Sequence, residues 1–350
     1  MDGVEAVLTS ERLQALQALI GQAQCVAVIA HARPDGDAMG SMLALALLLE
    51  AQGKQVVRIA PTPVPAFLGG MAGSDQVIVA SKQQYLAKKG IGESQLIVHV
   101  DHSAISRIDP YLADVVACSG KAKVAIDHHL APTDEFDLLF SYPSASSTCE
   151  LLYEIVVRLW GASCITPEVA HAIYLGLMTD TGSFSYSCSR GRTFEVAGHL
   201  VDAGADVPAI QNEVYRQYSK DRLRMYGVAL AEHLEFIADD RAAVIALDHD
   251  FLQAYNNQPG DTEGLVNEPL TVASVCISAL ITEKRNGTVR ISLRAKGNAV
   301  VNTLAARYFN GGGHPQASGG TMASSIEAAR ARVVEVIEAA IASGECFLNS

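Results

Sequence analysis

Short apolar runs recur through the first half of the chain, and each is bounded by polar or turn-forming residues. Their length and their valine and isoleucine content predict buried strands. These runs cover residues 25–30, 55–60, 76–80, 96–101 and 123–129. Residues 42–49, which follow the first run, are rich in strong helix formers. Strands that alternate with helices predict a parallel sheet joined by right-handed crossovers.

Two further helices are predicted where the chain carries start signals. Ser147 and Glu150 have the spacing of a capping box, which predicts a helix over residues 148–160. Pro167 suits the first turn of a second helix, over residues 167–180.

The second half of the chain has a different pattern. Residues 192–236 are helical in pattern and mixed in charge, which predicts a helical connector. Beyond it, strands are predicted over residues 242–247, 273–281 and 288–294, and helices over 298–310 and 325–343. Asn286 and Gly287 predict a hairpin turn between the last two strands.

A length of 350 residues allows two domains, each with its own core. We predict an α/β protein whose N-terminal domain, residues 1–190, has a doubly wound, mainly parallel sheet. Residues 191–240 are predicted to form the connector. Residues 241–350 are predicted to form a smaller α/β domain with a mixed sheet.

Composition narrows the setting in which the protein works. No apolar run reaches the length of about 20 residues that a membrane span needs, and the N-terminus lacks the basic start of a secretory signal. The seven cysteines are scattered without a Cys-x-x-Cys pair, which indicates a reducing compartment. We therefore predict a cytoplasmic protein. A net charge of −12 disfavours binding to long nucleic acid, but it leaves room for a small anionic substrate.

Candidate chemistry begins directly after the first predicted strand. His31, Asp35 and Asp37 lie in a turn at the carboxyl end of that strand, where ligands bind in open α/β sheets. One imidazole and two carboxylates are typical ligands of a divalent metal. The alternative is structural: Asp37 or Ser41 caps the next helix while Asp35 forms an Asx-turn. That alternative accounts for one aspartate more readily than for two aspartates and a histidine.

Three other strand or helix ends carry the same residue types. Asp101 ends one predicted strand, Asp127, His128 and His129 end another, and Asp180 ends a predicted helix. Each has a structural alternative when taken alone, such as capping a helix or ending a strand with a polar group. A carboxylate at a helix C-terminus is unfavourable for the helix dipole and indicates a cation nearby. Together these residues suffice for two divalent ions that share a bridging carboxylate.

The set of motifs resembles the DHH phosphoesterase superfamily, and within it the NrnA-like group of nanoRNases and pAp phosphatases. The resemblance rests on residues 31–41, Asp101, the Asp-His-His run at 127–129 and residues 179–184. It extends to a C-terminal DHH-associated domain through residues 292–294 and the glycine-rich run at 311–319. It implies an active site in the cleft between the two domains.

The resemblance also implies a role for each matching residue. The expected ligands of the first metal are His31, Asp35 and Asp101. Those of the second are Asp37, Asp101, His128 and Asp180, so Asp101 would bridge the two ions. The expected cofactors are two Mn²⁺ ions, with Mg²⁺ or Co²⁺ as alternatives.

The remaining roles concern the substrate. Asp127 is expected to orient an imidazole, and His129 is expected to face the scissile phosphate. The other end of the substrate is expected to bind Arg294, Gly311, Gly312, Gly313, His314 and Ser318. Glycine amides can approach an anion closely and form a nest around it.

Some residues depart from the family pattern or stay ambiguous. His102 is not part of it, and His99 is expected to pack in the core. Ser183 stands where many relatives carry a larger residue. Arg107 and Arg192 have two interpretations, as phosphate contacts or as ordinary exposed arginines.

The resemblance implies hydrolysis of short RNA oligonucleotides to mononucleotides, and of 3′-phosphoadenosine 5′-phosphate (pAp) to AMP and phosphate. A phosphodiesterase for cyclic di-AMP or its linear product pApA is the alternative within the same enzyme class. A non-catalytic nucleotide-binding regulator is the alternative from another class. Inorganic pyrophosphatase is disfavoured by the glycine-rich motif of the second domain. The expected partners are short RNA, pAp or other small nucleotides. Neither long nucleic acid nor a membrane is expected as a partner. The chain could also form a homodimer.

Overall fold

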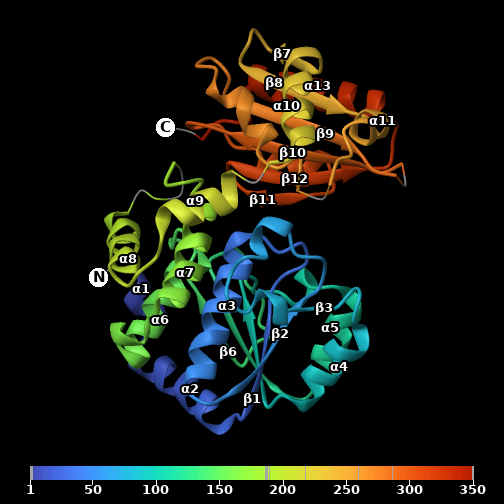
Figure 1. Ribbon diagram of the computed structural model, residues 1–350. Helices are drawn as coiled ribbons and strands as arrows, with labels where there is room; N and C mark the ends of the chain where they lie inside the picture. Colours follow the sequence, from blue (N-terminus) through green and yellow to red (C-terminus); the bar gives the residue numbers. More distant parts are fainter. Residues whose placement is uncertain are drawn as a thin grey trace. The chain divides into compact units, whose positions relative to one another are not determined.

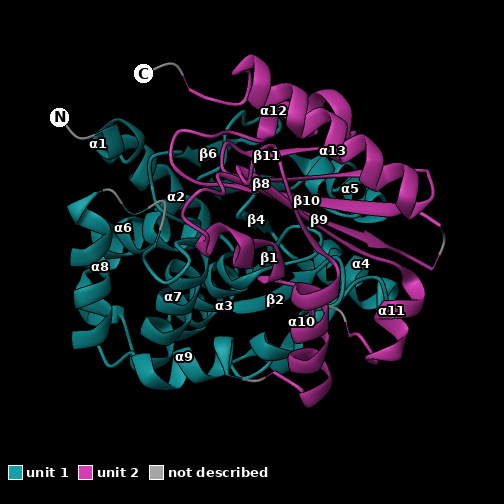
Figure 2. Cartoon of the chain, turned by 90° about the horizontal axis from the view of Figure 1, so that it is seen from above, with its two compact units in different colours: residues 1–217 teal, residues 218–350 magenta. Residues whose placement is uncertain are grey.

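The computed structural model describes residues 3–185, 188, 190–216, 218–258, 260–285 and 287–348. The chain divides into two compact units, residues 1–217 and 218–350 (Figures 1 and 2). The segment predicted as a connector is divided between them. Helices α8 (Gly191–Asp202) and α9 (Val207–Tyr215) belong to the first unit, whereas α10 (Lys220–Glu232) belongs to the second.

The first unit is built on a six-stranded sheet in the order β3-β2-β1-β4-β5-β6, in which every pair is parallel. The strands are β1 (Cys25–Ile29), β2 (Gln55–Ala60), β3 (Ile78–Val79), β4 (Leu96–Val100), β5 (Ala122–Asp127) and β6 (Leu138–Ser141). This is the strand order of doubly wound folds. The order reverses between β1 and β4, so the carboxyl ends of these two strands flank the switch point where ligands bind in such sheets.

Helices cover both faces of this sheet (Figure 1). Strand residues alternate between two cores: Val26 and Val28 pack with α3, α6 and α7, whereas Ala27 and Ile29 pack with α4 and α5. The helices of the first unit other than α8 and α9 are α1 (Gly3–Val7), α2 (Ser10–Gln22), α3 (Gly36–Ala51), α4 (Gln84–Glu93), α5 (Pro110–Ala117), α6 (Thr148–Trp160) and α7 (Pro167–Asp180). Because both faces of the sheet are buried, the sequences of these strands are continuous apolar runs.

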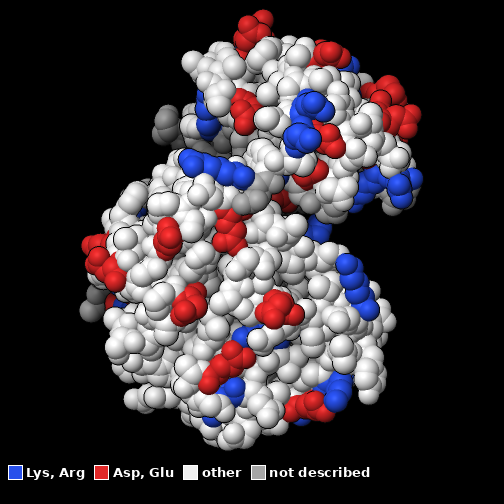
Figure 3. Space-filling view, in the orientation of Figure 1, with Lys and Arg blue, Asp and Glu red and all other residues white. Residues whose placement is uncertain are grey.

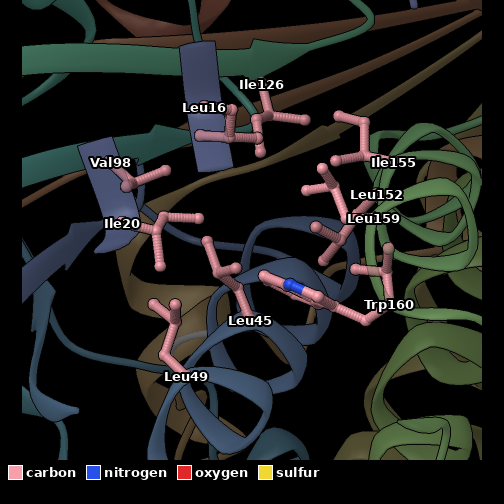
Figure 4. A pocket seen from close by; sticks show the side chains of 11 residues that line it. Leu16, Ile20, Leu45, Leu49, Val98, Ile126, Leu152, Ile155, Leu159 and Trp160 are labelled. Carbon is pink, nitrogen blue, oxygen red and sulfur yellow. The ribbon is translucent and has the colours of Figure 1, made fainter. Parts of the chain in front are cut away.

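The cavity drawn in Figure 4 lies in this core and not at the switch point. Its lining comes from α2, α3, α6 and the central strands, and is apolar throughout, with Trp160 at one side. Its volume is about 10 Å³. An apolar space of this size is a packing defect, because even a single buried water needs polar partners.

Helices α3 and α7 pack unusually closely because glycines line their contact. A β-carbon on Gly36 would lie 2.2 Å from Thr179 Oγ1, and one on Gly40 would lie 2.4 Å from the carbonyl oxygen of Ala172. A β-carbon on Gly176, from the α7 side, would lie 3.1 Å from the Cα of Asp37 in α3 and 2.3 Å from Sγ of Cys149 in α6. This contact brings the first turn of α3 and the last turn of α7 together. It thereby sets the separation of the two carboxylates that these turns carry.

The second unit has a mixed six-stranded sheet in the order β11-β12-β10-β9-β8-β7. Strands β8 and β9 are parallel, and every other neighbouring pair is antiparallel. The strands are β7 (Leu234–Ile237), β8 (Ala242–Leu247), β9 (Ile277–Glu283), β10 (Val289–Ala295), β11 (Gly312–His314) and β12 (Ala317–Met322). Helices α12 (Asn302–Tyr308) and α13 (Ile326–Ser343) pack in the core on one face of the sheet. Helix α10 packs in a smaller core with residues of β8 and β9 such as Ile245 and Leu280. The remaining helix is α11 (His249–Ala254).

The predicted fold class is confirmed: one doubly wound parallel sheet and one mixed sheet, both with helices. The main differences lie in strands that the sequence pattern did not reveal. The glycine-rich run, predicted as an anion-binding loop, forms β11 and the first half of β12. The strand predicted over 273–281 begins four residues later, as β9, and Asn286 of the predicted hairpin turn lies outside the described residues. Within the described ranges, no helix is both long and apolar enough to cross a membrane.

Candidate metal centre

The carboxyl edge of the parallel sheet gathers the candidate residues of the first unit. Strand β1 leads into His31, β4 leads into Asp101, and β5 ends on Asp127. Asp37 lies in the first turn of α3, and Asp180 is the last residue of α7. Four segments that are distant in sequence therefore converge on the switch point.

Asp101 lies at the centre of this group. Its Oδ2 is 3.2 Å from His31 Nε2, and its Oδ1 is 3.8 Å from His128 Nε2. Ligand atoms of His31, Asp35 and Asp101 lie within 4.8 Å of one another. Those of Asp37, Asp101 and His128 do so as well. The carboxylate of Asp101 therefore presents one oxygen to each of two candidate sites.

The backbone of Asp101 is also unusual. Its φ of 62° lies in the left-handed region, which residues other than glycine rarely adopt. The residue follows β4 directly, and only 1% of its surface is exposed. Strained backbone of this kind concentrates at functional sites, where the surroundings hold it in place.

Both imidazoles turn a nitrogen lone pair toward carboxylates. In His31, Nδ1 is 2.9 Å from the carbonyl oxygen of Ala32, so Nδ1 carries the proton and Nε2 faces Asp101. In His128, Nδ1 is 3.3 Å from the carbonyl oxygen of Ala145, and Nε2 is 3.3 Å from an oxygen of Asp180. A lone pair that faces a carboxylate oxygen is stabilised by a cation shared between them. Such backbone contacts fix the tautomer of metal-binding histidines.

Asp35 has a structural role beside its place in the cluster. It is the N-cap of α3, and its Oδ1 accepts hydrogen bonds from the amides of Asp37 and Ala38 at 3.1 Å. Its side chain is 60% exposed, and the same oxygen lies 3.9 Å from His31 Nε2. The structural alternative is therefore correct for the Asx-turn at Asp35, whereas the helix cap is Asp35 and not Asp37 or Ser41.

The N-terminus of α6 holds Asp37, and the sequence pattern did not reveal this contact. The amide of Thr148 donates to Asp37 Oδ2 at 2.7 Å, and the amide of Cys149 donates to Oδ1 at 2.8 Å. The Thr148 hydroxyl donates to Asp101 Oδ1 at 2.8 Å. A helix N-terminus attracts anions through its unpaired amides and its dipole. The start of the helix was predictable from Ser147, but not the carboxylates at which it points.

A buried carboxylate fixes the start of α6. Ser147 caps the helix by accepting from the Glu150 amide at 3.0 Å, as half of a capping box. The Glu150 side chain does not complete the box, because it bonds to Ser146 instead, at 2.5 Å to the hydroxyl. It also accepts from the hydroxyl of Thr193 in α8 at 2.7 Å.

Asp127 and His129 form a hydrogen-bonded pair within the cluster. His129 Nδ1 lies 2.7 Å from Asp127 Oδ1, and the Ser103 hydroxyl donates to Asp127 Oδ2 at 2.5 Å. Burial would raise the pKa of Asp127, but these hydrogen bonds hold it well below its usual range. Because Nδ1 donates to an ionised Asp127, Nε2 is the nitrogen of His129 that can act on a substrate.

The cluster carries more negative charge than its own cations compensate. Burial and the carboxylates around it, Asp37 first among them, raise the pKa of Asp101 well above its usual range. Burial together with Asp37 and Asp35 raises the pKa of Asp180 to about 8, against the opposing effect of His128. Burial would lower the pKa of His128, but Asp180 and Asp37 raise it above the ordinary value. Divalent cations would relieve this repulsion.

The ambiguous residues lie apart from this arrangement or are already bonded. His102 Nε2 is 2.8 Å from His99 Nδ1, and His102 Nδ1 is 2.9 Å from the Val100 carbonyl oxygen. Burial, with the nearby His31, lowers the pKa of His102 to about 3. His99 is fully buried, as expected for a core residue. Arg192 is bonded to Glu154 at 2.5 Å and to Glu195 at 2.8 Å, whereas Arg107 is exposed.

In the second unit, the predicted substrate-binding residues gather on β10, β11 and β12. Arg294 is half-buried on β10, and the hydroxyl of Ser318 on β12 donates to the carbonyl oxygen of His314 at 2.7 Å. Gly312, Gly313 and His314 pair with β12. A β-carbon on Gly311 would lie 1.9 Å from a backbone oxygen of β12. Close strand packing therefore requires glycine at that position, independently of any anion.

The donor set fits divalent cations. Carboxylate oxygens and imidazole nitrogens without thiolates suit Mn²⁺, Mg²⁺, Co²⁺ or Zn²⁺. A doubly wound sheet with such a group at its switch point can hold divalent metal ions of the kind that activate water in metal-dependent hydrolases.

Comparison with known proteins agrees with this class. Residues 25–177 match the DHH family, N-terminal domain, and residues 240–343 match the DHHA1 domain. The solved structure of an exopolyphosphatase-related protein from Bacteroides fragilis is 36% identical, with a TM-score of 0.91, over 95% of this chain and 97% of that one. The chain belongs to the DHH family of phosphoesterases.

Two curated relatives each match most of this chain. A probable bifunctional oligoribonuclease and PAP phosphatase, NrnA of Streptococcus mutans, is 29% identical over 85% of this chain and 89% of its own length. The cyclic-di-AMP phosphodiesterase PdeA of Listeria monocytogenes is 29% identical over 86% of this chain, but the match spans only 45% of that longer protein.

The raised pKa of Asp180 predicts how pH affects the metal-free protein. An ordinary aspartate in the unfolded chain titrates near pH 4, whereas Asp180 in the folded chain titrates at about 8. The folded protein thus binds an extra proton, and the stability this contributes is lost as pH rises through about 8. In chelator, we expect the melting temperature to fall by a few degrees between about pH 7 and about pH 9. Differential scanning fluorimetry would measure it.

Two comparisons isolate this effect. The Asp180→Asn variant should show a smaller fall, because its amide does not titrate. Saturating Mn²⁺ should abolish the fall, because a bound cation replaces the proton. An equal fall in the wild type and in Asp180→Asn would contradict the assignment.

Proposed function

We propose that this protein is a two-metal phosphoesterase that hydrolyses RNA fragments of a few nucleotides to mononucleotides, and pAp to AMP and phosphate. The observation that carries the proposal is Asp101, whose two oxygens face two separate imidazole–carboxylate groups. The similarity to NrnA of Streptococcus mutans, an oligoribonuclease and PAP phosphatase by name, extends over both units and supports this substrate class.

The two metals are assigned as follows. His31, Asp35 and Asp101 hold the first ion. The ligands of the second are Asp37, Asp101, His128 and Asp180. Manganese is the metal that the resemblance to the family implies, and the carboxylate and imidazole ligands are compatible with it. When bound, the two ions supply an activated water and neutralise charge that develops on the phosphoryl oxygens.

The chain's own residues orient the reactants. Asp127 and Ser103 hold His129 so that its Nε2 faces the substrate, where it donates a hydrogen bond or a proton to the phosphate. The amides at the start of α6 fix Asp37, and the Thr148 hydroxyl fixes Asp101. Preorganised ligands of this kind avoid the cost of rearranging the site during the reaction.

The second unit binds the other end of the substrate. We assign this role to Arg294, whose guanidinium suits phosphate recognition, and to His314. The strand pair that includes Gly311, Gly312, Gly313 and Ser318 completes the surface. Because these residues belong to the unit without the metals, they affect binding more than chemistry.

Charge supports a preference for short substrates. The chain has a net charge of −12. On the face drawn in Figure 3, the described lysine and arginine side chains occur singly or in small groups among acidic ones. A protein binds long RNA tightly when its basic side chains neutralise many successive phosphates. Scattered basic side chains provide few such contacts.

Similarity to PdeA of Listeria monocytogenes supports a second candidate within the same chemistry, a cyclic di-AMP or pApA phosphodiesterase. A non-catalytic nucleotide-binding regulator is the alternative from another class. The cluster argues against it, because a regulator would not need all six candidate metal ligands.

One panel of substrates separates these candidates. Initial rates with Mn²⁺ are measured on pAp, pApA, cyclic di-AMP, RNA from dinucleotide to pentanucleotide, and a long RNA. We expect the highest kcat/KM on pAp and the short RNAs. Faster turnover of cyclic di-AMP would favour the second candidate. Faster degradation of the long RNA would contradict the proposal, and binding without turnover of any substrate would indicate the regulator.

A further inference from the structure

Two loops flank the switch point of the parallel sheet, and each carries an exposed arginine. The loop after β1 contains Arg33, and the loop after β4 contains Arg107, at the end of the short helical turn Ile105–Arg107. The strand order reverses between β1 and β4, and ligands of doubly wound sheets bind outside the carboxyl ends of such strands. Both arginines therefore belong to the loops that also supply His31 and Asp101.

Main-chain hydrogen bonds fix the positions from which both side chains start. The amide of Ala32 donates to the carbonyl oxygen of Arg107 at 3.0 Å, so the two loops are tied together beside His31. The amide of Arg33 donates to Thr62 Oγ1 at 2.6 Å. Arg33 has a φ of 60°, in the left-handed region that residues with a β-carbon rarely adopt. Backbone strain of this kind concentrates at functional sites.

The loop that carries Arg107 is also held by the segment between β5 and β6. The amide and the hydroxyl of Thr133 both donate to the carbonyl oxygen of Ser103 at 2.9 Å. The amide of Ile105 donates to the carboxylate of Glu135 at 3.0 Å. A side chain on a fixed backbone loses less conformational freedom when it binds a ligand than one on a mobile loop does.

The two guanidinium groups have no partner within the part of the chain that the structure describes. Neither side chain forms a hydrogen bond or an ion pair there. The nearest acids in sequence are already engaged, since Asp35 caps α3 and Asp109 caps α5. Four other arginines of the first unit each pair with a glutamate: Arg58, Arg158, Arg190 and Arg192. Two unpaired cations on loops that touch each other favour the binding of an anion.

The lack of ion pairs also indicates which phosphate this anion is. The metal cluster holds more negative charge than its own cations compensate, so a guanidinium within reach of Asp35 or Asp101 would pair with it. Among these described residues, neither Arg33 nor Arg107 does so. Their guanidinium groups thus stand away from the metal ligands. They suit a phosphate next to the hydrolysed one, and not the hydrolysed phosphate itself.

We propose that Arg33 and Arg107 together bind a third phosphate of an oligonucleotide, beyond the one hydrolysed at the metals and the one assigned to Arg294. Guanidinium groups suit phosphate because they offer paired N–H donors. Both pAp and a 5′-phosphorylated dinucleotide carry two phosphates, whereas a 5′-phosphorylated trinucleotide carries three. The pair therefore favours fragments of three or more nucleotides. This inference rests on the proposed function, because it adds a contact to the same substrate.

The test compares pAp with 5′-phosphorylated di- and trinucleotides in the full-length Arg33→Ala and Arg107→Ala variants, with Mn²⁺. We expect KM for the trinucleotide to rise about three- to tenfold in each variant, because each loses a charge-assisted contact to phosphate. KM for pAp and for the dinucleotide should not change, nor should kcat for any substrate. Both side chains are exposed, so the melting temperature and the metal content should match those of the wild type.

Two further variants and a salt series serve as controls. Arg107→Lys keeps the charge but loses the paired donors, so its KM for the trinucleotide should lie between those of the wild type and Arg107→Ala. Lys88→Ala removes an exposed cation from α4, outside both loops, and should change no KM. The difference between Arg107→Ala and the wild type on the trinucleotide should shrink as salt is raised, because ions screen the contact.

The outcomes separate the two proposals. If the wild type hydrolyses short RNA and both alanine variants match it at every length, the third-phosphate site is wrong and the proposed function stands. An equal rise in KM on pAp and on the trinucleotide would also overturn the site, because pAp has no third phosphate. If the wild type hydrolyses neither RNA nor pAp, the proposed function fails. Isothermal titration of the trinucleotide into the wild type and Arg107→Ala, with Mn²⁺, then decides whether Arg107 contacts a phosphate.

Discussion

Replacing Asp101 by alanine is expected to abolish phosphoester hydrolysis, with a loss of at least about a thousandfold in kcat. Asp101 faces both imidazole–carboxylate groups, so its removal affects two ions and not one. Two adjacent cations repel each other, and a shared carboxylate offsets that repulsion. Metal analysis of the purified variant should find fewer than two ions per chain, and circular dichroism should find an intact fold.

The neighbouring histidine provides the control. The His102→Ala variant should keep both metals and most of the activity, because each nitrogen of His102 is within hydrogen-bond distance of His99 or of a backbone oxygen. Two tightly bound metals in Asp101→Ala would mean that the bridge lies elsewhere. If His102→Ala instead loses metal and activity, the metal ligand is His102 and not Asp101.

The second large effect is expected for His129→Ala. If His129 acts on the phosphate and does not bind metal, kcat should fall by about 10²- to 10⁴-fold while metal content stays unchanged. Asp127→Asn should cost less, about 10- to 100-fold, because it disturbs only the orientation of the imidazole. Steady-state kinetics on pAp together with metal analysis measure both effects.

Geometry leaves one competing role for His129. Its Nδ1 lies 3.6 Å from Asp101 Oδ1, and ligand atoms of Asp101, Asp127 and His129 lie within 4.8 Å of one another. A metal ligand at this position would be revealed by loss of an ion in His129→Ala. If both metal content and kcat are unchanged in His129→Ala, His129 takes no part in the reaction.

Sequence alone predicted the parallel sheet and the convergence of its candidate ligands. Strands buried on both faces are continuous apolar runs, so β1, β2, β4 and β5 were each found to within two residues of their observed bounds. The ligands followed from topology, because the carboxyl ends of parallel strands meet at one edge. Asp101, Asp127 and His31 could thus be brought together without any knowledge of distances.

The features that sequence could not predict depend on contacts between distant segments. Strands β11 and β12 consist largely of glycine and small polar residues, which signal a loop, and they become strands only because β12 pairs with β10 and β11 pairs with β12. Residues 76–80 gave a strand of only two residues, β3, at the edge of the sheet.

The contact between the N-terminus of α6 and Asp37 depends on the main chain and not on side chains. Both oxygens of Asp37 accept from main-chain amides, those of Thr148 and Cys149. Every residue except proline carries such an amide, so evolution can exchange the side chains at both positions without touching this contact. An alanine scan would not detect the two amide contacts; at Thr148 it would report only the loss of the hydroxyl that donates to Asp101. Methods that compare or replace side chains therefore do not detect the main-chain contacts that hold this candidate metal ligand.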